Sequence, residues 1–259
     1  MRLFPLLLLC ACGSTVATAP PAEGTEAPER ATVEPVAEPV LDGIRFRPVL
    51  HATLEISTPA GVIWLDPTTR GPLGDPHNAD IVLITDVHGD HLDSAGVDAV
   101  MKAGTRVVGP AAVSEQLASS TDVLANGESL TIGAVQITAV PMYNNHRGPE
   151  DGVLFHPKGR GNGYIIEVGS ERIYVAGDTA CTDEMKALTG ITTAFIPMNL
   201  PYTMTPEEAA ECVAAFSPNI AIPYHYRGAD NVMSDRSVFA DALADTTVIV
   251  AMSDFYPSE

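Results

Sequence analysis

Basic residues are scarce in this chain of 259 residues. Its 14 Lys and Arg stand against 33 Asp and Glu, which gives a formal net charge of -19 at pH 7. A charge of this sign and size repels phosphate backbones and anionic lipid head groups, so we expect no nucleic-acid partner. The acidity does not identify a substrate, because solubility outside the cell or an acidic habitat is enough to account for it.

The amino terminus lacks an apolar run long enough for a transmembrane helix. Its apolar stretch, Leu3 to Leu9, is short and is interrupted by Pro5, so it cannot span a bilayer as a permanent helix. Arg2 precedes the stretch and small residues follow it, an arrangement typical of an export signal. We therefore predict that the protein is exported.

Cysteines are also few, and two of the four lie beside this signal. Leu9-Cys10-Ala11-Cys12 resembles a bacterial lipobox, in which the signal is cut before a cysteine that then carries a diacylglycerol. The resemblance implies a signal peptide at 1–11, lipidation of Cys12 and a lipid-anchored protein of the bacterial cell envelope. Gly13 and Ser14 follow where an Asp would otherwise stand, which favours the outer membrane in a diderm host. The alternative is an ordinary cleaved signal with an incidental cysteine pair.

Large apolar side chains are almost absent from Thr15 to about Val40, a stretch of Ala, Pro, Glu and Thr. It cannot bury enough surface to offset its conformational entropy, so we expect residues 12–41 to form an extended tether and residues 42–259 a single folded domain. The later cysteines, Cys181 and Cys212, are able to pair in an oxidising compartment, but their separation does not show whether they meet. Cys212 lies in an apolar helical pattern, which favours a small buried hydrophobe.

Short runs rich in Val, Ile and Thr alternate with helical patterns from Ile44 onward. We predict strands at Thr53–Ser57, Val62–Leu65, Ile81–Thr85, Val135–Val140, Tyr164–Val168 and Arg172–Ala176, and helices at Ala95–Lys102, Ala111–Ala118, Asp183–Leu188, Thr205–Phe216 and about Ser234–Leu243. Asn126-Gly127 and Gly169-Ser170 stand at hairpin positions. Thr205-Pro206-Glu207-Glu208 has the Thr cap, early Pro and later Glu of a helix start. Hairpins come first and strand-helix alternation later in each half, which indicates a layered α/β fold.

Histidines and aspartates are concentrated in one loop, directly after the apolar run Ile81–Ile84. Five of the eight residues from 86 to 93 are of these two types: Asp86, His88, Asp90, His91 and Asp93. Packing has no use for them, and their mutual repulsion and desolvation are costly unless a cation compensates them. The loop therefore predicts a site for a divalent metal ion.

This loop resembles the H-x-H-x-D-H signature of the metallo-β-lactamase superfamily, with Asp86 in place of its first histidine. Asp66 after an early strand, Asp178 in Val-Ala-Gly-Asp-Thr and His225 in Ile-Pro-Tyr-His-Tyr follow in the order that the family leads one to expect. The resemblance spans about Leu41 to Tyr256. It implies the αβ/βα four-layer sandwich of that family, with helices outside two facing sheets and a site where strand-end loops meet.

Within the family, the chain resembles the branch of ascorbate-6-phosphate lactonase-like and related metal-dependent hydrolases, on three further segments: His51-Ala52-Thr53, Phe155-His156-Pro157-Lys158-Gly159 and Asn199-Leu200-Pro201-Tyr202-Thr203-Met204. The resemblance assigns two neighbouring ions to the following ligands: Asp86, His88 and His156 for one, Asp90, His91 and His225 for the other, and Asp178 for both. It also implies that Asp66 braces the ligand loop. A hydroxide held by the ions would attack the substrate, while Asp90 orients it and passes a proton to the leaving group.

Two departures from the family pattern bear on the metal. Asp86 makes the first position richer in oxygen, which shifts its preference from zinc toward manganese or iron; otherwise Asp86 accepts a hydrogen bond from a histidine ligand. The family's third histidine is expected after the strand Val135–Val140, where the chain reads Met142-Tyr143-Asn144. We expect His156 to take its place, with His146 and Asn144 as the alternatives.

Several residues near these motifs carry two interpretations each. His51 either supports the site from behind the ligands or satisfies a sheet edge. Lys158 and Arg160 either hold an anionic substrate group or are solvated. Tyr202 and Tyr226 either donate to a developing oxyanion or cover an apolar edge.

The resemblance and the residues together favour a metal-dependent hydrolase that cleaves an ester, lactone or phosphoester bond of a small molecule at the cell envelope. One or two divalent ions are expected, with zinc first and manganese or iron as alternatives. A lipoprotein of the same fold that binds metal or ligand without catalysis is the second hypothesis, and redox chemistry at an iron pair is the third. Substrate and oligomeric state do not follow from the fold.

Overall fold

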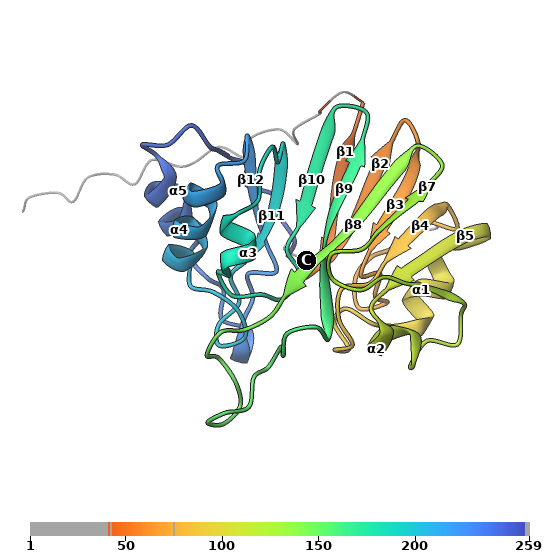
Figure 1. Ribbon diagram of the computed structural model, residues 1–259, viewed down its shortest axis with the longest axis horizontal. Coiled ribbons are helices and arrows are strands. Elements are labelled where there is room, and N and C mark those ends of the chain that lie inside the picture. Colours follow the sequence, from red (N-terminus) through yellow and green to blue (C-terminus); the bar gives the residue numbers. More distant parts are fainter. Residues whose placement is uncertain (1–40, 42, 75, 257–259) are drawn as a thin grey trace, which may run out of the picture. The chain divides into compact units, whose positions relative to one another are not determined.

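Two β-sheets form the framework of the protein (Figure 1). The computed structural model describes residues 41, 43–74 and 76–256, so the predicted signal, Cys12 and nearly all of the tether lie outside the described residues. One sheet orders its described strands as β1 (Arg45–Leu50), β2 (Thr53–Thr58), β3 (Gly61–Leu65), β4 (Ala79–Leu83), β5 (Met101–Gly109) and β6 (Thr121–Val123). The other orders them as β13 (Ile249–Val250), β12 (Ile220–Tyr224), β11 (Thr193–Pro197), β10 (Glu171–Val175), β9 (Gly161–Val168), β8 (Val135–Met142) and β7 (Ser129–Ile132).

The two sheets repeat one plan. Strands β1 to β3 pair antiparallel and β3 to β6 pair parallel. Strands β7 to β10 likewise pair antiparallel, and β10 to β13 pair parallel. The similar order of elements in the two halves, visible in the sequence, has this origin. Parallel strands end at the same edge of their sheet, so the loops after β3, β4, β10 and β12 are brought together there.

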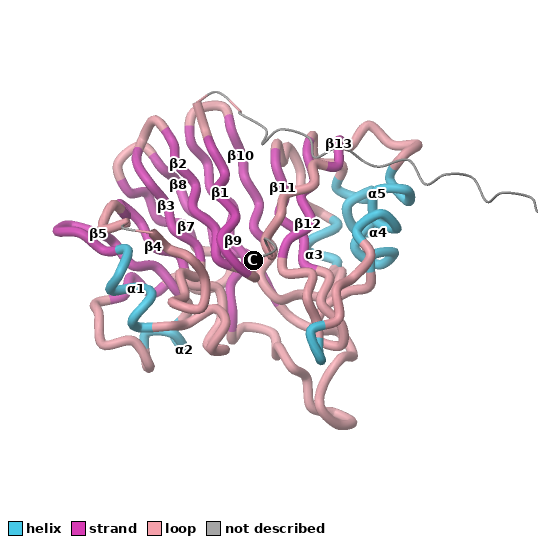
Figure 2. Tube along the Cα trace, turned by 180° about the vertical axis from the view of Figure 1, so that it is seen from behind, coloured by secondary structure: helices cyan, strands magenta, loops and turns pink. Residues whose placement is uncertain are grey.

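Helices cover the outer face of each sheet, and the predicted four-layer sandwich is confirmed (Figures 1 and 2). Helices α1 (Ser94–Val100) and α2 (Ala111–Ser114) lie on the side of the first sheet, and α3 (Asp183–Lys186), α4 (Pro206–Phe216) and α5 (Arg236–Leu243) on the side of the second. A short 3-10 turn, Ala229–Asn231, follows β12. None of the described helices combines the length and the apolarity needed to cross a membrane.

The main apolar core lies between the sheets. Phe46 of β1 meets Phe195 of β11 edge to face, with ring centroids 5.1 Å apart, and both rings are buried. A second cluster, around Trp64 and Val97, joins the first sheet to α1. Burial of a side chain of this size stabilises the fold by about 1.5–3 kcal/mol, so these two clusters hold the strand ends that carry the polar loops.

Some of the predictions made from local sequence signals are confirmed, and one is wrong. The capping box is confirmed, because Thr205 Oγ1 accepts a hydrogen bond from Glu208 N at 3.1 Å and the Glu208 carboxylate accepts one from Thr205 N at 2.8 Å. Gly169-Ser170 turns the antiparallel pair β9 and β10, as predicted. The hairpin predicted at Asn126-Gly127 is wrong, because these residues carry the chain from β6 of one sheet to β7 of the other. The Asn126 amide instead donates to Asn162 Oδ1 and two backbone carbonyls.

The pairing of the late cysteines, left open by the sequence, is a disulfide between Cys181 and Cys212 with Cα atoms 5.5 Å apart. Cys212 is at the same time fully buried in α4. The bond spans 31 residues, for which the loss of chain entropy in the unfolded state corresponds to about 3–4 kcal/mol of stability. It fastens α4 to the loop that precedes α3.

Candidate metal centre

The loop after β4 is shaped by tight turns that leave its polar side chains on one side. His91 N and Leu92 N both donate to His88 O, at 2.9 and 2.8 Å. Asp93 then caps α1, accepting from Ala95 N at 3.0 Å and from Thr69 N at 2.8 Å. Our view that packing has no use for any acidic group of this loop is therefore wrong for Asp93, whose carboxylate starts a helix. A helix cap directly after the cluster is the signal that identifies it.

Asp66 orients His91 from behind. It follows β3 with a positive φ of 43°, and its Oδ2 accepts from His91 Nδ1 at 2.8 Å. The same carboxylate accepts from Thr85 N at 2.8 Å and from Thr85 Oγ1 at 2.6 Å. Because Nδ1 of His91 donates to Asp66, the neutral form of the ring carries its lone pair on Nε2, which faces the site, the arrangement that second-layer carboxylates give to metal-binding histidines.

One group of ligand-type side chains surrounds His91 Nε2. It consists of Asp178 after β10, His225 after β12 and Asp90 from the ligand loop. His91 Nε2 lies 3.3 Å from Asp178 Oδ2 and 3.3 Å from His225 Nε2. His225 Nε2 in turn lies 3.3 Å from Asp90 Oδ2 and 3.4 Å from Asp178 Oδ1. His91, Asp178 and His225 are buried, whereas the Asp90 side chain is 29% exposed and opens the group to solvent.

Backbone conformation helps to bring these two strand ends to the site. Gly177, directly before Asp178, has a φ of 66°, and a Cβ there would lie 2.4 Å from Met142 Sδ. His225 also has a positive φ, of 44°. Left-handed backbone at a non-glycine residue is unfavourable, and such strained residues cluster at functional sites.

A second group lies beside the first and consists of Asp86, His88 and His156. His88 Nδ1 is 2.9 Å from Asp86 Oδ2, and His156 Nε2 is 4.0 Å from the same oxygen. His156 Nε2 is also 3.2 Å from Asp178 Oδ2, so Asp178 stands between the two groups. We name them the Asp86 group and the His91 group.

The three alternatives for the missing third histidine occupy different places. Asn144 Oδ1 accepts from both His156 Nδ1, at 2.7 Å, and His156 N, at 2.9 Å. The Asn144 amide donates to the Tyr202 carbonyl at 2.8 Å. The structure thus brings the His156 ring into the site with Asn144 behind it. His146 is exposed and lines a surface hollow beside Cys181.

Residues flanking the groups include some that sequence reasoning did not place. Arg160 pairs with Asp86, whereas Lys158 pairs with Glu184, on the surface. The Tyr202 ring packs edge to face on Phe155, with centroids 5.1 Å apart. The Tyr226 hydroxyl accepts from Phe255 N at 3.1 Å. These contacts join residues that are far apart in the sequence, so no local pattern predicts them.

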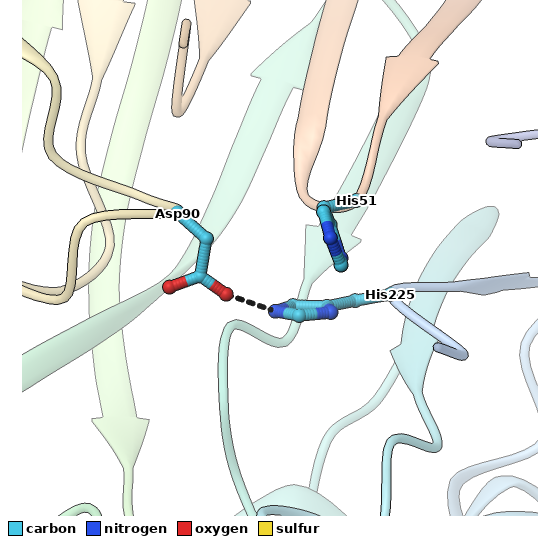
Figure 3. A group of neighbouring side chains, drawn as sticks. All are labelled: His51, Asp90 and His225. Atoms are coloured by element: carbon cyan, nitrogen blue, oxygen red, sulfur yellow. Dashed lines mark ion pairs between the residues drawn. The ribbon is translucent and has the colours of Figure 1, made fainter. Parts of the chain in front are cut away.

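His51 stands beside the His91 group (Figure 3). Figure 3 shows its ring against that of His225, which an ion pair joins to Asp90. The ring centroids are 5.1 Å apart. Tyr256 OH lies 2.8 Å from His51 Nδ1, and the Arg227 guanidinium contacts His51 Nε2. Burial is the main cause that lowers the pKa of His51 to about 3, and the electrostatic effects of His225 and Arg227 act in the same direction. Sequence reasoning missed both Tyr256 and Arg227.

The electrostatic field of the site favours a positive charge. Burial alone would raise the pKa of Asp178, yet the imidazoles of His225, His91 and His156 lower it well below its usual range. Burial alone would lower the pKa of His91, yet the carboxylates of Asp178, Asp90 and Asp66 raise it well above its usual range. A carboxylate cluster of this kind stabilises any cation placed among its imidazoles.

The His91 group fits a metal ion on two observations. Asp178 Oδ1 is buried and makes no hydrogen bond, although His225 Nε2 lies 3.4 Å away, so the cost of desolvating this oxygen is only partly offset. Four separations between nitrogen or oxygen atoms of the group are 3.3–3.4 Å, and that between His91 Nε2 and Asp90 Oδ2 is 3.9 Å; ligand atoms of a tetrahedral ion with bonds of about 2.0–2.1 Å lie roughly 3.3 Å apart. Two imidazole nitrogens and two carboxylates suit zinc, manganese or iron.

Comparison with known proteins identifies the family of the chain. The family model described as the beta-lactamase superfamily domain matches residues 58–226. A metal-dependent hydrolase from Enterococcus faecalis is 31% identical over 214 residues, which are 77% of this chain and 93% of that protein. One from Methanopyrus kandleri is 27% identical over 221 residues, 81% of this chain and 95% of its own.

Solved structures agree as well. A crystal structure from Parabacteroides distasonis, assigned as a metal-dependent hydrolase, superposes with a TM-score of 0.73 at 36% identity, over 81% of this chain and 92% of that one. The match covers both sheets, and the family match alone spans the loops after β4, β10 and β12. The chain therefore belongs to the metallo-β-lactamase superfamily of metal-dependent hydrolases.

Proposed function

We propose that this protein hydrolyses an ester, lactone or phosphoester bond of a small molecule, with a catalytic divalent ion held by His91, Asp178, His225 and Asp90. The observation that carries the proposal is the buried, unpartnered Asp178 Oδ1 among imidazole nitrogens that Asp66 and β12 aim at one point. Zinc is the expected ion, with manganese or iron as alternatives. When bound, the ion supplies a water of lowered pKa and polarises the bond under attack.

The remaining chemistry belongs to residues of the chain. Asp90 is the acidic group of the site that reaches solvent, so it is placed to accept a proton from the attacking water and return it to the leaving group. Asp66 holds the tautomer of His91, and Asn144 does the same for His156. Arg227 and Tyr256 contact the two ring nitrogens of His51 and so fix this ring beside the site.

Activity is tested by changing Asp90 to Asn. We expect turnover of a panel of carboxylic esters, lactones and phosphodiesters by the metal-loaded protein, and a fall of about 10²–10⁴-fold in kcat for Asp90→Asn, the usual contribution of a positioned acid or base. Asp122→Asn is the matched control, because its carboxylate pairs with Arg106 away from the site. Full activity of Asp90→Asn would contradict the role of Asp90. Failure of the fully loaded protein to turn over any of the panel would favour a binding protein.

The proposal extends to the place of action: we infer that a lipid on Cys12 anchors the domain, residues 42–259, to the cell envelope through the segment 12–41. Cys12→Ser is expected to release the protein from the membrane fraction of a bacterial host and to abolish incorporation of labelled fatty acid. Cys10→Ser is the matched control, because Cys10 leaves with the signal and its loss should change neither readout. Membrane association and labelling that persist in Cys12→Ser would rule out this anchor.

A further inference from the structure

The Asp86 group is already paired with a cationic side chain, that of Arg160. The Arg160 guanidinium makes a two-point contact with Asp86: Nε lies 3.0 Å from Oδ1 and Nη2 lies 2.7 Å from Oδ2. The Asp86 side chain is fully buried, and that of Arg160 is 24% exposed. This two-point geometry is that of an ion pair between a guanidinium and a carboxylate.

His88 is occupied in the same way. Its Nδ1 faces Asp86 Oδ2 at 2.9 Å, and its Nε2 faces Arg160 Nη2 at 3.4 Å. With Nδ1 as donor to the carboxylate, Nε2 is left as acceptor toward the guanidinium. Both oxygens of Asp86 and both ring nitrogens of His88 therefore have partners within the protein.

The backbone holds Arg160 in this position. Arg160 directly precedes β9. The first residues of β9 lie against the chain just after β4, where Asn162 N donates to Thr85 O at 2.9 Å. A Cβ at Gly161 would lie 2.9 Å from Thr85 O, so the close approach depends on glycine at that position. The start of β9 is consequently fixed beside residue 86, and Arg160 needs only its side chain to reach the carboxylate.

The His91 group differs from the Asp86 group in this respect. Among the described residues, Asp66, Asp90 and Asp178 form ion pairs with histidines and with no arginine or lysine. Asp178 Oδ1 has no hydrogen-bond partner at all. The Asp86 group therefore has an arginine as its counter-ion, whereas no described arginine or lysine pairs with the carboxylates of the His91 group.

We propose that Arg160 stands in for one of the two metal ions of this site, so that the protein binds a single catalytic ion, in the His91 group. This inference rests on the proposed function. At position 86 the chain has a carboxylate where the family pattern has an imidazole. A carboxylate is a suitable partner for arginine, because two N–H groups of the guanidinium can each donate to one carboxylate oxygen. A divalent ion in the Asp86 group would have to displace Arg160 or lie close to its positive charge, and like charges at such distances repel strongly in a partly buried site.

The number of ions per chain tests the proposal. The purified full chain, freed of metal and titrated with cobalt(II), is expected to reach its absorption end point at one equivalent, with elemental analysis giving one ion per chain. Arg160→Met leaves Asp86, His88 and His156 without a cation, and its end point is expected to rise to two equivalents. Arg160→Lys keeps a positive charge and is expected to stay at one. Arg106→Met, which removes an exposed arginine from its pair with Asp122, is the matched control and should also stay at one.

Three outcomes of these measurements would contradict the proposal of a single ion. Two tightly bound equivalents in the unaltered protein would overturn the proposal and leave the hydrolase function standing, and this measurement suffices even if Arg160→Met fails to fold. An end point that remains at one equivalent in folded Arg160→Met would also overturn it. A chain that binds no metal at all would overturn the proposed function together with this inference.

Discussion

Changing Asp178 to Asn is expected to remove bound metal and hydrolytic activity together. The Asp178 carboxylate lies 3.2–3.4 Å from nitrogens of His156, His91 and His225, so it is in contact with all three imidazoles. The amide keeps the shape but loses the charge, and one of its ends presents donors toward nitrogen lone pairs. Loss of a residue that only supports a ligand costs about 10–100-fold. We therefore expect kcat/KM to fall by more than about 100-fold.

The measurement pairs elemental analysis with turnover at saturating metal. Circular dichroism establishes that the variant is folded. Asp241→Asn is the matched control, because Asp241 is an exposed residue of α5. An Asp178→Asn protein that still holds its metal and retains activity would show that the centre of the site has been misplaced.

The second large effect is expected at Asp66, which contacts no substrate and acts through His91. Asp66→Asn offers an amide where Thr85 N, Thr85 Oγ1 and His91 Nδ1 all require an acceptor, so at least one buried donor loses its partner. His91 is then free to rotate or to change tautomer. Metal affinity should fall by about 10–100-fold.

A competition titration with a coloured chelator measures this affinity directly. Thr85→Val removes one donor to Asp66 while leaving the carboxylate on His91, so its effect should have the same direction and be smaller. A purely structural role for Asp66 would lower the melting temperature without changing the affinity of the folded protein, and that outcome would contradict its role in positioning His91.

Much of the fold could be predicted because its signals are local. The apolar run Ile81–Ile84 and the polar loop after it are contiguous in the chain, and the capping box of α4 is complete within four residues. Strands β5, β11 and β12 were harder to recognise as strands. Met101–Gly109 follows α1 without a break, so the sequence pattern predicts a helix as far as Lys102, although the helix ends at Val100.

The site is less predictable, because its contacts join distant parts of the chain. Arg160 meets Asp86 across 74 residues, and Tyr256 meets His51 across 205. From the sequence, the Arg160 side chain could be either solvated or bound to an anionic substrate group. Only the folded chain shows that it contacts a buried carboxylate. Asn144 illustrates the same limit: its residue type suited a ligand, whereas its position behind His156 makes it a hydrogen-bond acceptor for that ring.

The metal content of the purified full chain tests the central claim most directly. Elemental analysis should find about one equivalent of zinc, manganese or iron, and a strong chelator should lower the melting temperature by several degrees, because an ion at about 100 times its Kd contributes about 2.7 kcal/mol to stability. Added divalent ion should restore it. A metal-free protein whose melting temperature ignores both chelator and added ions would contradict the account.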